Sequence, residues 1–343
     1  MMANNNIATE VRYDFVDFLK GVGIFLVVWG HTMVPRSIYI YSFHMPLFFF
    51  LSGFLHKGKP IRQFIIGKIN SLYIPYAVFT LLSWFFYLWR QLARKDHSGL
   101  STHYYKLTSI VTGTADNGGN NPIWFLTCLL VVSCGFLLIS QIKNAKFRPW
   151  VVLGVSLIGY LLSLTRINLF FNIDIACSAI VFYYLGFSVR RRNLLDYIDS
   201  VRRWVRVLAL IPAIIAQLGA AYLNVTVAPI RWVNMAGNNL GNYFLFYTAA
   251  CLGIFVYLVI GYWIQKIRLI NFLGKNSLLI LATHKPMLLL FNLYVGKFLD
   301  IQGKWHGLLA TIVVLAVSIP LILLVNRWVP LLIGKKPVLK ILE

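Results

Sequence analysis

The sequence predicts an all-α fold: a polytopic transmembrane helical bundle of about ten spans, with both termini cytoplasmic. Of the 343 residues, 59% are hydrophobic and 12% are charged, whereas roughly a quarter of the residues in a soluble domain are charged. The apolar residues gather into stretches near the length of about 20 residues that a spanning helix needs. Most of the 32 Lys and Arg residues lie in alternate loops between those stretches. These observations exclude a water-soluble globular protein, a disordered chain and a nucleic-acid-binding domain.

The spans follow one another along the whole chain, which we interpret as one membrane domain (residues 1–343). The expected spans are 16–35, 39–56, 72–90, 122–141, 150–165, 168–188, 206–223, 242–262, 272–294 and 306–333. Several contain Gly and Pro, which membrane helices tolerate. Residues 1–14 are the expected cytoplasmic tail, and 91–121 the longest extracytoplasmic loop. This loop is rich in Gly, Asn, Ser and Thr, and it is either a lid over an outward-facing site or a tolerated surface loop.

The basic residues set the expected orientation. With the N-terminus in the cytoplasm, most Lys and Arg residues fall on the cytoplasmic side, as the positive-inside rule requires. The net charge of +22 is then topological and faces anionic lipid headgroups, so it needs no nucleic-acid partner. The four cysteines lie in apolar spans and read as buried thiols, and no ligand spacing indicates a metal. We therefore expect a multi-pass protein of the cytoplasmic (inner) membrane without a metal.

The first span carries the densest set of ionisable groups. Lys20 and His31 are 11 residues apart, which corresponds to about three helical turns, so the two side chains share one face at a rise of roughly 16 Å. Asp17 lies one turn before Lys20 and can pair with it. Alone, Lys20 could be a snorkelling residue and His31 a hydrogen-bonded core histidine. Together, a cation and a base at this separation suit a long substrate with a phosphate end and a reactive end, such as an acyl-coenzyme A.

Other polar residues fall near the depth of His31. His44 opens the second span, and with His31 it could either bind a hydroxyl acceptor or form a packing and hydrogen-bonding pair. Trp124, after Asn121 and Pro122, is either an interfacial anchor or part of an acceptor site. Asp174 is either half of an ion pair with Arg166 or part of the same acceptor site.

The ninth span contains Thr283-His284-Lys285-Pro286. A histidine and a lysine before a kinking proline are costly in lipid, so His284 is expected to face the bundle interior. There it either lines the same cavity as His31 or packs elsewhere in the bundle. Ser52-Gly53 is interpreted as a site of close helix approach. The remaining histidines fall in loops or at interfaces and receive no role; they are His56, His97, His103 and His306.

Several of these segments resemble the acyltransferase-3 family of integral membrane acyltransferases. Residues Asp17–His31 resemble its Arg/Lys-x10-His signature, and Phe43–Phe54 its second-span motif. Pro122–Leu126 is similar to its PLWFL-type segment, and Phe272–Ser277 with the later His284 to its G-x-x-S…H element. The matches run in order over about residues 12–290. The closest similarity is to the stand-alone sugar O-acetyltransferases, such as those acting on enterobacterial common antigen.

The resemblance implies transfer of an acyl group, acetyl in that subgroup, from cytoplasmic acyl-CoA (acetyl-CoA) to a hydroxyl of an envelope polysaccharide or lipid-linked sugar. It implies His31 as the essential catalytic histidine with Lys20 as its cationic partner. The expected roles are catalysis by His31, Lys20, Asp17 and His44; acceptor binding by His284, Trp124, Asn121 and Asp174; and CoA binding by Lys20, Arg62, Lys68, Arg190 and Arg191, with Arg192 as a further candidate.

Two features depart from the family pattern. Lys20 stands where the family often has Arg, and Lys68-Ile69-Asn70-Ser71 lacks the second cation of an Arg-x-x-Arg element found in some members. The rival hypotheses are a proton-coupled transporter or flippase of a lipid-linked sugar, and a glycan polymerase or export partner. Intramembrane Lys, His and Asp also suit proton relay, but the sequence shows no sign of two similar halves, which counts against a transporter.

Overall fold

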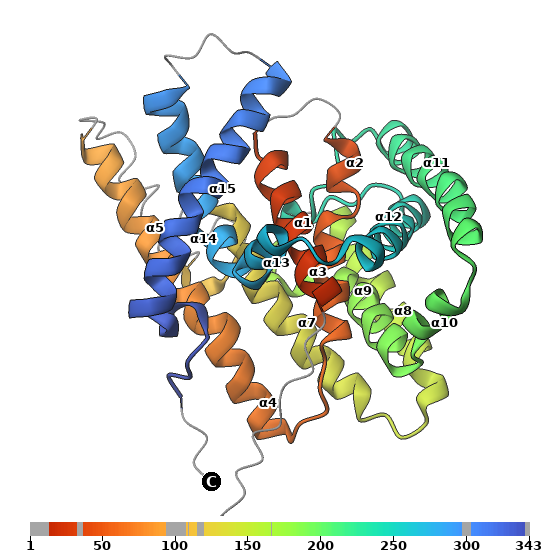
Figure 1. Ribbon diagram of the computed structural model, residues 1–343. Helices are drawn as coiled ribbons and strands as arrows, with labels where there is room; N and C mark the ends of the chain where they lie inside the picture. Colours follow the sequence, from red (N-terminus) through yellow and green to blue (C-terminus); the bar gives the residue numbers. More distant parts are fainter. Residues whose placement is uncertain are drawn as a thin grey trace, which may run out of the picture.

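The computed structural model describes residues 14–32, 37–93, 108, 110–114, 120–165, 167–296 and 303–339, and all structural statements refer to these residues. They form a bundle of helices in which no strand occurs (Figure 1). The α-helices are α1 (Asp14–Gly30), α2 (Ile38–Tyr41), α3 (His44–Phe54), α4 (Ile61–Lys68), α5 (Ile74–Ala93), α7 (Trp124–Ser140), α8 (Arg148–Thr165), α9 (Ile173–Arg191), α10 (Leu194–Ser200), α11 (Arg203–Val227), α12 (Tyr243–Ile264), α13 (Arg268–Lys275), α14 (Ser277–Leu290) and α15 (Gly303–Trp328). Two π-helical turns, Ile69–Tyr73 and Phe291–Val295, continue α4 into α5 and extend α14.

Seven helical segments of the described chain are long and apolar enough to cross a membrane. They are Ile61–Ala93, Ala145–Thr165, Phe170–Arg191, Arg203–Val227, Tyr243–Ile264, Ser277–Val295 and Trp305–Trp328. Two shorter apolar segments, Ile38–Phe54 and Trp124–Ser140, and the 17-residue α1 fall at the other expected spans. The all-α polytopic membrane protein is thus confirmed, while the count of ten and the cytoplasmic location of both termini stay predictions.

Helix α1 lies in the middle of the bundle, between α11 and α12 on one flank and α5 and α15 on the other (Figure 1). It contacts α3, α12, α13, α14 and α15. Leu19, Ile24 and Val28 are fully buried on it. A helix that is apolar on most of its circumference is stable only inside a bundle or in lipid. Of the charged residues of α1, Asp17 and Lys20 are half-buried against these neighbours and Asp14 is exposed.

Two glycines allow helices to meet backbone to backbone. A Cβ atom on Gly274 of α13 would collide with the carbonyl oxygen of Asp17 on α1. A Cβ atom on Gly53 of α3 would likewise collide with the carbonyl oxygen of Tyr183 on α9, which agrees with the close approach expected at Ser52-Gly53. Small residues at such crossings bring backbones together and gain packing energy in membrane proteins.

The apolar stretch 272–294 is not one helix, which corrects the sequence-based boundary. The chain breaks at Asn276 (φ −117°, ψ 16°), between α13 and α14. The side chain of Asn276 donates to the carbonyl of Phe272 (2.8 Å) and accepts hydrogen bonds from Asn326 Nδ2 (3.0 Å) and Lys335 Nζ (2.8 Å). This polar network satisfies groups that the break would otherwise leave without partners. The break sets the ends of α13 and α14 beside the start of α1.

Candidate active site

His31 lies at the C-terminal end of α1, where the helix unwinds. Its amide still donates to the carbonyl oxygens of Val27 and Val28 (both 3.2 Å), so the residue keeps the helical direction of α1. The centre of its ring is 5.2 Å from that of His284 and 6.5 Å from that of Tyr41. Three helical segments, α1, α2 and α14, thus converge on one imidazole.

His44 and His284 are both held through Nδ1. Nδ1 of His44 is 2.8 Å from the carbonyl oxygen of Ile40, and Nδ1 of His284 is 3.0 Å from that of Ile280. A carbonyl oxygen only accepts hydrogen bonds, so Nδ1 carries the proton in each neutral ring and Nε2 carries the lone pair. Nε2 of His284 is buried and has no hydrogen-bond partner in the described part of the chain. The site therefore offers imidazole nitrogens able to accept a proton.

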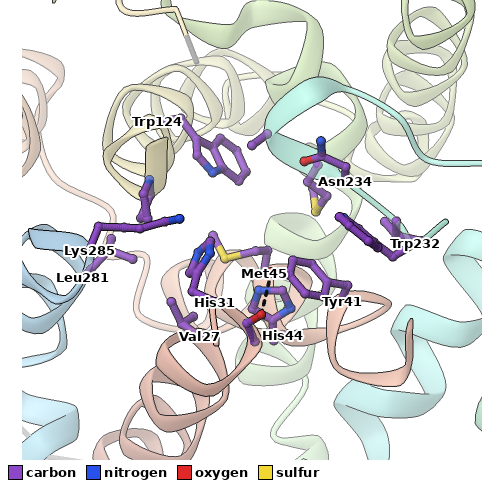
Figure 2. Close-up of a pocket in the computed structure, with 15 residues that line it drawn as sticks. Val27, His31, Tyr41, His44, Met45, Trp124, Trp232, Asn234, Leu281 and Lys285 are labelled. Atoms are coloured by element: carbon purple, nitrogen blue, oxygen red, sulfur yellow. Dashed lines mark hydrogen bonds between the residues drawn. The ribbon is translucent and has the colours of Figure 1, made fainter. Parts of the chain in front are cut away.

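A cavity of about 260 Å³, here called the His31 cavity, opens beside His31 (Figure 2). His44, Trp124 and Lys285 line it together with His31. The rest of the wall includes residues from α2 and from the segment before α12, among them Tyr41, Trp232 and Asn234. The His31 cavity has the mixture of apolar walls and few polar groups that is typical of small-molecule sites.

Asparagine side chains fix the walls of the His31 cavity. Asn120 is fully buried and donates to Ser83 Oγ (2.9 Å) and to the carbonyl of Ala282 (2.7 Å), which ties the segment before Trp124 to α5 and α14. Asn224 on α11 donates to the carbonyl of Leu240 (2.9 Å) and accepts from the amide of Asn242 (2.7 Å). These bonds hold the loop that carries Trp232 and Asn234.

A second cavity of about 410 Å³ lies on another side of His31. Thr32, Asn292 and His306 line it, and His31 is common to both cavities. His306, which receives no role from the sequence motifs, is therefore near the site. His56 is instead buried among aromatic rings, with Nδ1 3.0 Å from Tyr183 Oη, rather than at an interface. His97 and His103 lie outside the described residues.

Lys20 lines a different cavity, of about 660 Å³, at the opposite end of α1. Asp17, Lys275 and Lys335 also line this Lys20 cavity, and Asp17 acts electrostatically on Lys20. Lys335 Nζ donates to Asn276 Oδ1 (2.8 Å) and Asn326 Oδ1 (2.6 Å). The Lys20 and His31 cavities have no described lining residue in common. Along α1 they are separated by the roughly 16 Å rise of 11 helical residues.

The other expected CoA contacts line none of these three cavities. Lys68 Nζ lies 5.4 Å from the centre of the Phe64 ring, close enough to Lys20 for their charges to interact. Arg190 donates to the carbonyl of Phe54 (3.1 Å), and Arg62 and Arg191 are exposed. The sequence analysis gave no CoA-binding role to Lys275, near the start of the expected span 272–294, or to Lys335, just after the expected span 306–333.

The expected acceptor residues are only partly brought together. Trp124 is 4% exposed and lines the His31 cavity, so it is not an interfacial anchor. His284 contacts the His31 ring without lining that cavity. Asp174 is buried elsewhere, accepts from the amide of Leu169 (3.2 Å), and does not line the His31 cavity. Arg166 and the side chain of Asn121 lie outside the described structure.

A comparison with protein families decides the class of this site. The family described as "Acyltransferase domain" matches residues 13–327. The chain belongs to the acyltransferase-3 family. This family match spans α1 with Lys20 and His31, and it continues through His284 and nearly all of α15. No curated protein and no solved structure gives a significant match.

Membership of this family makes the protein a membrane acyltransferase, which needs an acyl donor and an acceptor. Among the described residues no group of His, Cys, Asp and Glu has the arrangement of a metal site. The described residues that line the His31 cavity offer two imidazole rings, the hydroxyl of Tyr41, the amide of Asn234 and the ammonium of Lys285. Proton transfer by histidine is the reaction these groups perform best near neutral pH.

Proposed function

We propose that the protein transfers an acyl group, acetyl in the first instance, from cytoplasmic acyl-CoA to a hydroxyl of an envelope polysaccharide or lipid-linked sugar. The observation that carries this proposal is the placement of His31 and Lys20 at opposite ends of the buried helix α1, each lining a cavity. An acyl-CoA has phosphates at one end and a thioester at the other. The lysines of the Lys20 cavity can pair with the phosphates, and His31 can act at the thioester.

In the proposed reaction His31 is the general base. A ring nitrogen of His31 takes the proton of the acceptor hydroxyl, and the oxygen attacks the thioester carbonyl carbon. The carbon–oxygen bond forms, the carbon–sulfur bond breaks, and the departing thiolate takes the proton back from His31. The products are the O-acyl ester and free CoA. His44 or His284 assists His31 in this proton transfer, and an acyl-histidine intermediate is the alternative route.

The donor is proposed to bind in the Lys20 cavity from the cytoplasm. Three lysines line this cavity: Lys20, Lys275 and Lys335. Asp17 is the acidic residue among its described lining residues. Charge-assisted hydrogen bonds from lysine to phosphate are among the stronger polar contacts in proteins. Arg62, Lys68, Arg190 and Arg191 stay candidates for drawing the polyanionic coenzyme to this surface. The pantetheine arm then has to extend along α1 to bring the thioester to His31.

Mass spectrometry of surface glycans tests the proposal. Glycans are compared between a strain lacking the protein, the same strain complemented with it, and the strain complemented with His31→Ala. We expect one acyl group per modified unit in the strain complemented with the wild-type protein. We expect no such group in the deletion strain or in the strain complemented with His31→Ala. The mass difference identifies the acyl group. An unchanged glycan in the deletion strain, with altered export of a lipid-linked sugar, would instead favour a flippase.

A further inference from the structure

Among the residues that the structure describes, the wall of the His31 cavity carries a positive charge and no negative one. Lys285 extends into the cavity between Trp124 and His31 in Figure 2. No described Asp or Glu lines this cavity. Lys285 is half-buried, and no hydrogen bond or ion pair holds it within the described chain. An ammonium group partly withdrawn from water gains free energy when an anion meets it.

A second cation stands at the edge of the same cavity. The guanidinium of Arg231 lies 4.6 Å from the centre of the Trp232 ring, and Trp232 lines the cavity. Arg231 itself is exposed. The Trp232 ring in turn lies 5.9 Å from that of Tyr41. Arg231 is thus an exposed cation next to the cavity wall, whereas the half-buried Lys285 lies on the wall itself.

The walls suit a sugar ring. Trp124, Tyr41 and Trp232 present aromatic surfaces that pack against the apolar faces of a sugar and carry polar edges that hydrogen-bond to hydroxyls. The donor's phosphates do not account for Lys285. The thioester has to reach His31, which leaves the phosphates of a CoA molecule in the Lys20 cavity, roughly 16 Å away along α1.

We infer that the acceptor is an acidic sugar, whose carboxylate or phosphate pairs with Lys285 while a neighbouring hydroxyl meets His31. This inference rests on the proposed function and narrows its acceptor class. Lys285 is then a specificity-determining residue that binds the charged group of the acceptor. Arg231 draws the same group toward the cavity through long-range attraction.

The charge of the natural product gives the first test. The glycan that loses its acyl group in the deletion strain is separated by anion exchange, and its repeat unit is sequenced by mass spectrometry. We expect the acylated unit to contain a uronic acid, another carboxylate or a phosphate. An acylated but neutral unit would overturn the acidic-acceptor inference and leave the acyltransferase proposal intact. Absence of any acyl change would overturn the proposed function itself.

Kinetics with charge-neutralised acceptor give the second test. The isolated unacylated glycan is used as acceptor with full-length protein in membranes, either native or after its carboxyl groups are reduced to alcohols or its phosphates are removed. Impaired transfer after carboxyl reduction would identify a carboxylate as the anion, and impaired transfer after phosphate removal would identify a phosphate. We expect Lys285→Met to raise the KM for native glycan by about tenfold or more, as expected for loss of a charge-assisted hydrogen bond. Lys285→Arg should restore most of the affinity.

The decisive measurement is whether Lys285→Met removes the difference in KM between native and neutralised glycan. The wild-type protein should prefer native over neutralised glycan, and Lys285→Met should use both with similar KM. If Lys285→Met lowers kcat equally with both acceptors, Lys285 serves the reaction rather than the acceptor's charge, and the inference fails. An unchanged KM for acetyl-CoA in Lys285→Met shows that the variant retains its donor site. A wild-type protein indifferent to neutralisation would equally contradict the inference.

Discussion

At the residue scale, the histidines differ in what holds them. Nδ1 of His44 and of His284 bonds to a backbone carbonyl, which fixes the tautomer of each ring. For the side chain of His31 the structure gives ring contacts with Tyr41 and His284 instead. His31 also lines both cavities at its end of α1. These differences support the proposal that His31 is the histidine that meets a substrate.

His31→Ala should abolish acyl incorporation into the glycan while leaving membrane insertion intact. General-base catalysis by histidine contributes typically about 10²- to 10⁴-fold in rate, and removal of a ring at a cavity wall leaves the packing of α1 unchanged elsewhere. Acyl content measured by mass spectrometry, with the membrane level of the variant determined by immunoblotting, checks this. Full acylation by a correctly inserted variant would contradict the mechanism.

Lys20→Ala should weaken acetyl-CoA binding more than Lys20→Arg does. Alanine removes the positive charge from the Lys20 cavity, whereas arginine keeps it, and one charged hydrogen bond to a phosphate corresponds to about tenfold in affinity. The KM for acetyl-CoA of purified protein measures the effect. Equal KM values for the two variants would show that Lys20 only reaches toward the membrane surface.

At the element scale, close helix crossings fix the relative positions of the Lys20 and His31 cavities. Gly274 brings α13 against α1 beside Asp17, and α13 carries Lys275 into the Lys20 cavity. The break at Asn276 then lets α14 turn so that His284 and Lys285 reach the other end of α1. The sequence analysis predicted one unbroken span over 272–294. Such a span would have placed His284 and Lys285 differently relative to α1.

Gly274→Ala should destabilise the protein, because an added Cβ atom would meet the Asp17 carbonyl oxygen and force the two backbones apart. The cost of overpacking is typically about 1–3 kcal/mol. Gly154→Ala in α8 is the matched control, since nothing lies within 4 Å of its added Cβ. Thermal unfolding of detergent-solubilised protein compares the two. A midpoint for Gly274→Ala equal to that of the control would contradict the close packing of α1 and α13.

At the scale of the whole molecule, the orientation in the membrane still rests on the positive-inside rule. The rule places the loop between α3 and α4 in the cytoplasm and the end of α11 outside. The cavity containing Lys20 then faces the compartment that holds acyl-CoA. The cavity containing His31 lies toward the envelope, where glycans are assembled.

Single cysteines test this orientation in intact cells. We expect a membrane-impermeant maleimide to label Thr226→Cys, at the exposed end of α11, and to leave Gly58→Cys unlabelled until the membrane is opened. The wild-type protein is the control, because any labelling of it comes from the native cysteines. Cys134, Cys177 and Cys251 are half-buried, and Cys128 is buried. The reverse labelling pattern would invert the topology and place the Lys20 cavity on the wrong side for a cytoplasmic donor.

The sequence by itself determined the membrane class, the helical content and the spacing of Lys20 and His31. These properties depend on composition and on the periodicity of one helix, which are local. It also indicated the acyltransferase family, because its motifs occur in order along the chain. Only the tertiary structure decided that Trp232 and Lys285 share a cavity with His31, and that Lys335 joins Lys20 across the break at Asn276. These residues come from helices and loops far apart in the chain, and helix packing, which no local pattern encodes, brings them together.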